Sequence, residues 1–80
     1  MKVCLLAKIK TEILDPQGKA LEASIHRLGV ETIRNVRVGK VIEFEIEGMT
    51  KEQASTKINE LCEQILINPL LEDVSYEFKD

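Results

Sequence analysis

The sequence contains few of the side chains from which catalytic and metal sites are built. It has one histidine, His26, and two cysteines, Cys4 and Cys62, which lie far apart and form no CxxC pair. This set predicts neither a zinc site nor a disulfide framework, and we expect both cysteines to be reduced thiols. It also cannot supply a nucleophile, a base and an orienting group together, so we expect no catalytic and no metal-binding residues.

Aromatic residues and long apolar runs are scarce as well. Tryptophan is absent, only two phenylalanines and one tyrosine are present, and the formal net charge is -3. A nucleic-acid surface needs Lys and Arg in excess and aromatic rings for stacking, so this composition argues against one. The first apolar run is interrupted at Lys8, and no segment approaches the roughly 20 apolar residues that span a bilayer. We expect a cytoplasmic protein that binds neither nucleic acid nor a membrane.

What the chain does contain is typical of one folded domain, residues 1–80. Hydrophobic residues make up 44% of the sequence and charged residues 31%, which argues against disorder. A chain of this length buries only about 60 to 65% of its unfolded surface. Its stability alone is therefore small, and help from a partner chain is expected.

The segment Leu14-Asp15-Pro16-Gln17-Gly18 marks a corner between a strand and a helix. Asp15 is a good N-cap and Pro16 suits the first helical position, so a helix is predicted from Pro16 to Leu28, with Gly29 as its C-terminal stop. A helix N-terminus also attracts anions, but the carboxylate of Asp15 already occupies this one. The corner is therefore interpreted as structural.

Alternation of apolar and polar residues predicts the strands. The apolar positions of the first strand are Val3, Leu5, Ala7 and Ile9, and those of the last are Val74, Tyr76 and Phe78. A second strand is predicted at Val30–Val38, with Arg34 and Arg37 exposed. A third follows, in which Ile42, Phe44 and Ile46 alternate with Glu43, Glu45 and Glu47. Gly39-Lys40 lies between these two strands, and we favour a hairpin there over one long bent strand.

The three glutamates of the third strand lie on one face of it. Next neighbours on such a face are about 6.6 to 7 Å apart, and no histidine or aspartate cluster accompanies them. We therefore interpret this face as solvated or facing a partner, and not as a metal or acid–base site.

A second helix is predicted after Thr50, which forms a capping box with Gln53. Its apolar stripe is Ala54, Ile58, Leu61, Cys62 and Ile65. Asn68 followed by Pro69 predicts the end of the helix, because the residue before a proline is pushed out of the helical region.

The predicted order is βαββαβ, that of ferredoxin-like α+β domains, with an antiparallel sheet and two helices on one face. The other face would carry Cys4, Leu6 and Val41 among charged residues. Apolar residues left there predict association through that face or a sheet edge, giving a homodimer or a larger homo-oligomer.

Several fragments, in order and spacing, resemble the PurS subunit family of phosphoribosylformylglycinamidine synthase. The fragments are Leu14-Asp15-Pro16-Gln17-Gly18 followed by Ala20, Arg27-Leu28-Gly29, Val36-Arg37-Val38-Gly39-Lys40 followed by Glu43, and Glu60-Leu61-Cys62 leading to Asn68-Pro69, Glu72 and Tyr76. The resemblance covers nearly the whole chain.

This resemblance implies a non-catalytic subunit in de novo purine synthesis. In that family the glutaminase PurQ releases ammonia, the synthetase PurL uses it with ATP, and PurS bridges the two. The resemblance thus implies PurL and PurQ as partners, and ATP, Mg and glutamine as cofactors and substrate of the complex, none of them bound by this chain. Asp15, Pro16, Gly18, Asn68 and Pro69 carry over as structural corner residues. The turn of Arg37, Gly39 and Lys40 is different, because it is basic and exposed in an acidic protein. Our hypothesis is that these residues and Glu43 contact a partner subunit. The alternative is that Gly39 only makes the turn and the charges are solvated.

Two other classes share the βαββαβ order. A regulatory module of the ACT type binds amino acids near the first strand-to-helix loop, but it uses a glycine-rich loop where this chain has Glu12-Ile13-Leu14. An acylphosphatase-like enzyme would need an arginine and a glycine-rich phosphate cradle in the same loop, which has neither. The ACT-type module remains the main alternative.

Overall fold

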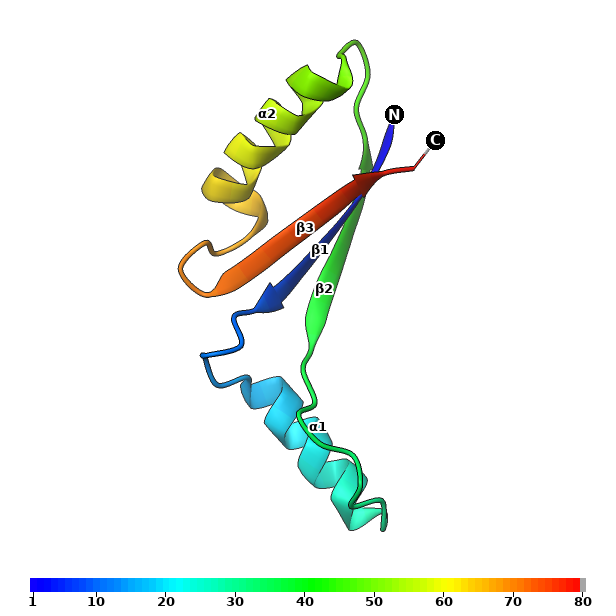
Figure 1. Cartoon of the computed structure of the whole chain (residues 1–80), viewed down its shortest axis with the longest axis vertical. Coiled ribbons are helices and arrows are strands. Elements are labelled where there is room, and N and C mark those ends of the chain that lie inside the picture. Colours follow the sequence, from blue (N-terminus) through cyan, green and yellow to red (C-terminus); the bar gives the residue numbers. More distant parts are fainter. Residues whose placement is uncertain (80) are drawn as a thin grey trace.

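The computed structural model describes residues 1–79 and combines an antiparallel sheet with two α-helices (Figure 1). The elements in chain order are β1 (Lys2–Ile9), α1 (Pro16–Arg27), β2 (Gly39–Glu45), α2 (Lys51–Leu61), the π-helical turn η1 (Cys62–Leu66) and β3 (Glu72–Phe78). The predicted α+β class is confirmed. Neither helix of the described residues is long and apolar enough to cross a membrane.

The sheet is built around β1, with strand order β2-β1-β3 and antiparallel pairing on both sides. Leu5 lies opposite Ile42 on β2 and Tyr76 on β3, so the predicted apolar positions of the three strands share one face. The opposite, open face carries Leu6 beside Val41, as expected from the alternation.

The core lies between this sheet and α2. Val3, Leu5 and Ala7 of β1 are buried against Ile58 and Cys62. The capping box of Thr50 with Gln53 is present, with the hydroxyl of Thr50 accepting the backbone N–H of Gln53 at 3.2 Å. Local capping and the apolar stripe therefore agree for this helix.

The prediction that Ile65 is the last residue of the core-facing stripe is wrong, because Ile65 is 75% exposed. The helix changes from α to π geometry at Cys62, which shifts the following residues around the axis. Helical backbone ends at Leu66, with Ile67 extended. Asn68 and Pro69 follow in the turn that leads to β3.

The strand predicted at Val30–Val38 does not form, and Gly39-Lys40 is not a hairpin turn. Its place in the chain is taken by an extended segment that runs back along α1 and continues directly into β2. The backbone N–H groups of Val36 and Val38 donate to side chains of the α1 region, Glu22 and Asp15, instead of to a strand. Neither possibility at Gly39 is therefore correct, because there is no hairpin and the chain before Gly39 is not part of a long bent strand.

The first helix does not cover the sheet as predicted. Gly18 is its only buried residue, Leu21 is 49% exposed and Leu28 83% exposed. In Figure 1, α1 extends from one end of the sheet, whereas α2 lies alongside it. We call residues 10–38 the arm and the remaining described residues the body.

The arm makes the molecule elongated. Its radius of gyration is 16.1 Å and its principal extents are 51 × 27 × 14 Å, whereas a compact chain of this length has a radius of gyration of about 12 Å. The single core is thus confined to the body.

Candidate functional site

The side chain of Asp15 joins the start of α1 to the start of β2. Asp15 is the predicted N-cap, with extended backbone, and one carboxylate oxygen accepts the N–H of Gly18 at 3.0 Å. The other oxygen accepts the N–H of Val38 at 2.8 Å. The carboxylate is 2% exposed and both its oxygens have donors. Pro16 occupies the first turn, as predicted. These residues are structural.

Gly18 is needed because the extended segment passes very close to α1. A Cβ at this position would lie 2.1 Å from the carbonyl oxygen of Val36, a contact that no side chain tolerates. The sequence identified Gly18 as a corner residue but gave no signal for this close approach.

Arg37 lies at the base of the arm, where it connects the two chain segments that link the arm to the body. Its guanidinium nitrogen Nη2, which carries two N–H groups, lies within hydrogen-bond distance of three backbone carbonyl oxygens, those of Lys10 at 2.7 Å, Ile13 at 3.0 Å and Ile9 at 3.3 Å. All three acceptors belong to the end of β1 or the loop after it. We call this set of hydrogen bonds, together with the bond from Val38 to Asp15, the clasp.

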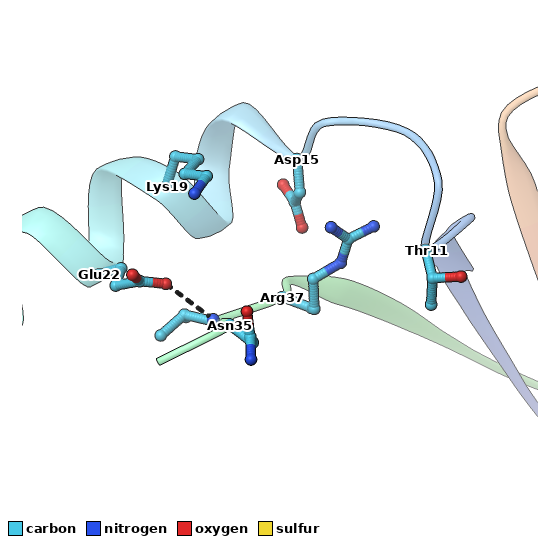
Figure 2. Close-up of a pocket in the computed structure, with 7 residues that line it drawn as sticks. Thr11, Asp15, Lys19, Glu22, Asn35 and Arg37 are labelled. Carbon is cyan, nitrogen blue, oxygen red and sulfur yellow. Dashed lines mark hydrogen bonds between the residues drawn. The ribbon is translucent and has the colours of Figure 1, made fainter. Parts of the chain in front are cut away.

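The clasp lies beside a cavity of about 260 Å³ between α1 and the extended segment (Figure 2). The lining residues are Thr11, Asp15, Lys19, Glu22, Asn35, Val36 and Arg37. Figure 2 shows the guanidinium of Arg37 between the carboxylate of Asp15 and the loop that carries Thr11. Asn35 has a φ of 57°, which bends the segment away from strand geometry before it reaches Arg37.

Hydrogen bonding lowers the pKa of both carboxyl groups in this region. The N–H of Val38 is the largest cause of the lowered pKa of Asp15, followed by the N–H of Gly18 and, against burial, the charge of Arg37. The N–H of Val36 lowers the pKa of Glu22 in the same way. Both side chains are therefore ionised acceptors of backbone N–H groups and are poor proton donors near neutral pH.

The remaining candidates for a reactive group are the thiol of Cys62, which is buried, and the imidazole of His26, which lies within hydrogen-bond distance of a backbone carbonyl. Burial raises the pKa of the Cys62 thiol, which makes this cysteine a poor nucleophile. The imidazole Nε2 of His26 is 2.7 Å from the carbonyl oxygen of Ile33, at the far end of the arm. No group of three or more metal-ligating side chains occurs among residues 1–79.

The remaining residues of the predicted partner interface are not gathered at a turn. Gly39 begins β2 opposite Lys8, and a Cβ there would lie 2.7 Å from the carbonyl oxygen of Ala7. The ammonium of Lys40 lies 3.4 Å from the carboxylate of Glu72. Glu43 is exposed on the open face, opposite Cys4. Arg37 thus belongs to the clasp, Gly39 to the sheet, and Glu43 to the open face.

Asn68 and Pro69 organise the turn before β3. The side chain of Asn68 accepts the N–H of Leu70 at 3.1 Å, and its backbone carbonyl accepts the N–H groups of Leu71 and Glu72. Asn68 therefore stabilises the turn before β3, whereas the predicted helix stop at Asn68 and Pro69 stays a prediction, because the helical backbone already ends at Leu66.

Comparisons with known proteins agree with the resemblance found in the sequence. The family model described as PurS, phosphoribosylformylglycinamidine (FGAM) synthase, matches residues 2–80. The PurS subunit of Bacillus subtilis is 33% identical over 79 residues, which covers 99% of this chain and 93% of that protein. The PurS subunit of Methanocaldococcus jannaschii is 30% identical over 78 residues, with coverage of 98% and 92%.

Solved structures show the same likeness in three dimensions. A crystal structure of Bacillus subtilis PurS superposes with a TM-score of 0.89 at 33% identity, covering 99% of this chain and 98% of that chain. A chain in the structure of PurLQS from Thermotoga maritima superposes with a TM-score of 0.83 at 26% identity, with coverage of 95% and 93%.

Proposed function

Because this chain belongs to the PurS family of phosphoribosylformylglycinamidine synthase subunits, we propose that it is the accessory subunit that bridges the glutaminase PurQ and the synthetase PurL. In this role it has no catalytic residues and supports the transfer of ammonia between the two enzymes. The observation that carries the proposal is the match over residues 2–80, together with the likeness to a chain of the Thermotoga PurLQS assembly.

The proposal assigns the cofactors to the complex and none to this chain. ATP, Mg and glutamine are consumed or bound by the synthetase and glutaminase subunits, and this chain contributes surfaces. The lowered pKa values of Asp15 and Glu22 and the buried thiol of Cys62 fit such a role, because these groups serve folding. The proposal also puts the subunit in the cytoplasm with the complex.

We further propose that the subunit is a homodimer or a larger homo-oligomer, in which a second copy covers the apolar side chains of the arm. Leu21, Leu28 and Ile33 are exposed there, while Ile42 and Phe44 on the core face of β2 are only partly buried. Both helices were predicted to cover this face, but within residues 1–79 of a single chain α1 does not cover the sheet. Apolar surface on both the arm and the sheet supports mutual coverage by two copies.

The open face of the sheet is the proposed surface for a partner subunit. Glu43 lies there with Glu45, and Glu77 is on the other side of Cys4. The adjacent apolar pair Leu6 and Val41 lies on the same face. This combination suits a partner surface with an apolar centre and basic residues at its rim. Of the residues first predicted to contact a partner, Glu43 keeps that role in this proposal, whereas Lys40 pairs with Ala7 on the opposite face of the sheet and lies beside Glu72.

Sedimentation of purified PurL and PurQ with and without this chain tests the bridging role. With substrate nucleotide and glutamine present, we expect a species that contains all three proteins. When the chain is omitted, the association of PurL with PurQ should be weaker. A variant carrying Glu43→Gln and Glu45→Gln on the open face should reduce the ternary species, whereas Glu52→Gln with Glu60→Gln, on the exposed side of α2, should not. Equal assembly with and without the chain would contradict the bridging role.

A further inference from the structure

The arm is joined to the body by two segments, and the clasp lies where they meet. One segment is the loop after β1, and the other is the extended segment that continues into β2. Arg37 belongs to the extended segment, and its three acceptor carbonyls belong to the end of β1 and the loop that follows it. The guanidinium therefore links the two connections across the base of the arm.

Apolar packing contributes little to the direction of the arm. The core consists of side chains from the three strands, α2 and the residues that follow it, and the helix of the arm adds none of its large side chains to it. Beyond the clasp, the described contacts at the base are the backbone bond from Lys10 to Leu71 at 2.8 Å and the ion pair of Lys10 with Asp73 at 3.5 Å. Polar contacts thus dominate this junction.

All three bonds of Arg37 come from one guanidinium nitrogen, Nη2, whose two N–H groups are shared among three carbonyl oxygens. The planar guanidinium is always charged and holds this nitrogen in a fixed geometry, whereas a lysine ammonium is a strongly hydrated point charge on a flexible stem. The carboxylate of Asp15 adds to this arrangement, because it fixes Val38, the next residue of the same segment. The two side chains thus hold the two segments of the arm together at its base, and the bond from Arg37 to Ile9 at 3.3 Å connects them to β1.

We infer that Arg37 is a positioning residue, which sets the direction of the arm through the clasp and so presents the apolar side chains of the arm to a second copy. This inference rests on the proposed homo-oligomer but differs from the earlier hypothesis that Arg37 touches a partner. A partner contact would be lost on mutation without any change in the arm. A positioning residue acts through the arm, so its loss is visible within the chain itself.

The test compares Arg37→Ala and Arg37→Lys with the control Arg34→Ala, which removes the same charge from an exposed position of the same segment. Two quantities are measured on the full chain: amide hydrogen exchange at Val36 and Val38, and the self-association constant by sedimentation. We expect Arg37→Ala to raise exchange at both amides roughly threefold to tenfold and to weaken self-association by a similar factor, with β1 amides unchanged. Arg37→Lys should lie between this variant and wild type, and Arg34→Ala should match wild type.

Each other outcome is decisive. Unchanged exchange in Arg37→Ala overturns the clasp as the element that fixes the arm, and if self-association falls at the same time, Arg37 is a contact residue. Raised exchange with wild-type self-association overturns the positioning role. If the wild-type chain does not self-associate at any concentration, the proposed homo-oligomer fails, and the exchange result still decides whether Arg37 fixes the arm.

Discussion

The carboxylate of Asp15 accepts the backbone N–H of Val38 across 23 positions of sequence, at 2.8 Å. The same side chain caps α1, so one buried carboxylate fixes both the start of the helix and the segment that returns along it. Asp15 therefore caps its own helix and also makes a long-range contact.

Acid should loosen the arm before it unfolds the body. The pKa values of Asp15 and Glu22 are lowered in the folded chain, so their contribution to stability is complete above the unfolded pKa values, about 4, and is lost as the pH falls through the lower folded values. The amide signals of Val36 and Val38 should change with pH in this range, while those of β1 do not. In Asp15→Asn the acid-dependent change at Val38 should be absent. The same change in that variant would contradict the assignment.

Gly18→Ala should destabilise the arm although alanine favours helices. The new Cβ would meet the carbonyl oxygen of Val36, which belongs to backbone and cannot move without displacing the clasp. We expect a loss of about 1 to 3 kcal/mol in the free energy of unfolding, measured by urea denaturation. The control Gln17→Ala replaces the preceding, exposed residue of the same helix and should have little effect. Stability equal to wild type in Gly18→Ala would mean that the segment does not pass at this distance.

Two isoleucines in and just after α2 should contribute very differently to the free energy of unfolding. Ile58 is fully buried in the core, so Ile58→Ala should lower the free energy of unfolding by about 2 to 5 kcal/mol. Ile65 lies in the π-helical turn and is 75% exposed, so Ile65→Ala should change the free energy of unfolding by no more than about 0.5 kcal/mol. Thermal or urea denaturation measures both. A large loss in Ile65→Ala would show that a second copy or another partner buries this residue.

Exposed leucines of the arm should affect association more than folding. Leu21→Gln and Leu28→Gln remove apolar surface that is 49% and 83% exposed in the single chain. If a second copy covers these side chains, both variants should dissociate at higher protein concentration than wild type, by roughly tenfold or more. Glu52→Gln on α2 serves as the control. Sedimentation equilibrium measures the dissociation constant, and wild-type values in both leucine variants would remove the arm from the interface.

The sequence predicted well those elements that are specified by their own residues. Asp15 with Pro16 at one helix, and Thr50 with Gln53 at the other, carry their capping chemistry in adjacent positions, and both helices begin where expected. The alternation around Leu5 and around Ile42 likewise gave the correct faces of the sheet. In these cases local propensity and tertiary structure agree.

The failures concern residues whose roles depend on distant partners. Val30–Val38 has the composition of a strand, but its N–H groups find acceptors on Asp15 and Glu22, so it extends along a helix. Nothing near Glu22 in the sequence indicated that role. The apolar stripe of α1 predicted burial against the sheet, although that helix leaves the sheet. Such a stripe shows that a helix needs a partner surface, but it cannot say which surface or which chain provides it.

Arg37 illustrates the same limit at the candidate site. An exposed arginine beside Gly39-Lys40 suggested a partner contact, whereas its guanidinium binds carbonyl oxygens more than 20 residues away. The same loop is where a regulatory ACT-type module would bind its ligand, and here that loop's carbonyls accept from Arg37. The family resemblance, in contrast, depended on the order of many short fragments and was confirmed over residues 2–80.

A rate measurement tests the proposal that this chain bridges PurL and PurQ and has no active site of its own. Formation of formylglycinamidine ribonucleotide by purified PurL and PurQ is measured with and without the chain, with either glutamine or ammonia as the nitrogen source. We expect the chain to raise the glutamine-dependent rate and to leave the ammonia-dependent rate of PurL nearly unchanged. Equal glutamine-dependent rates with and without the chain would contradict the proposal.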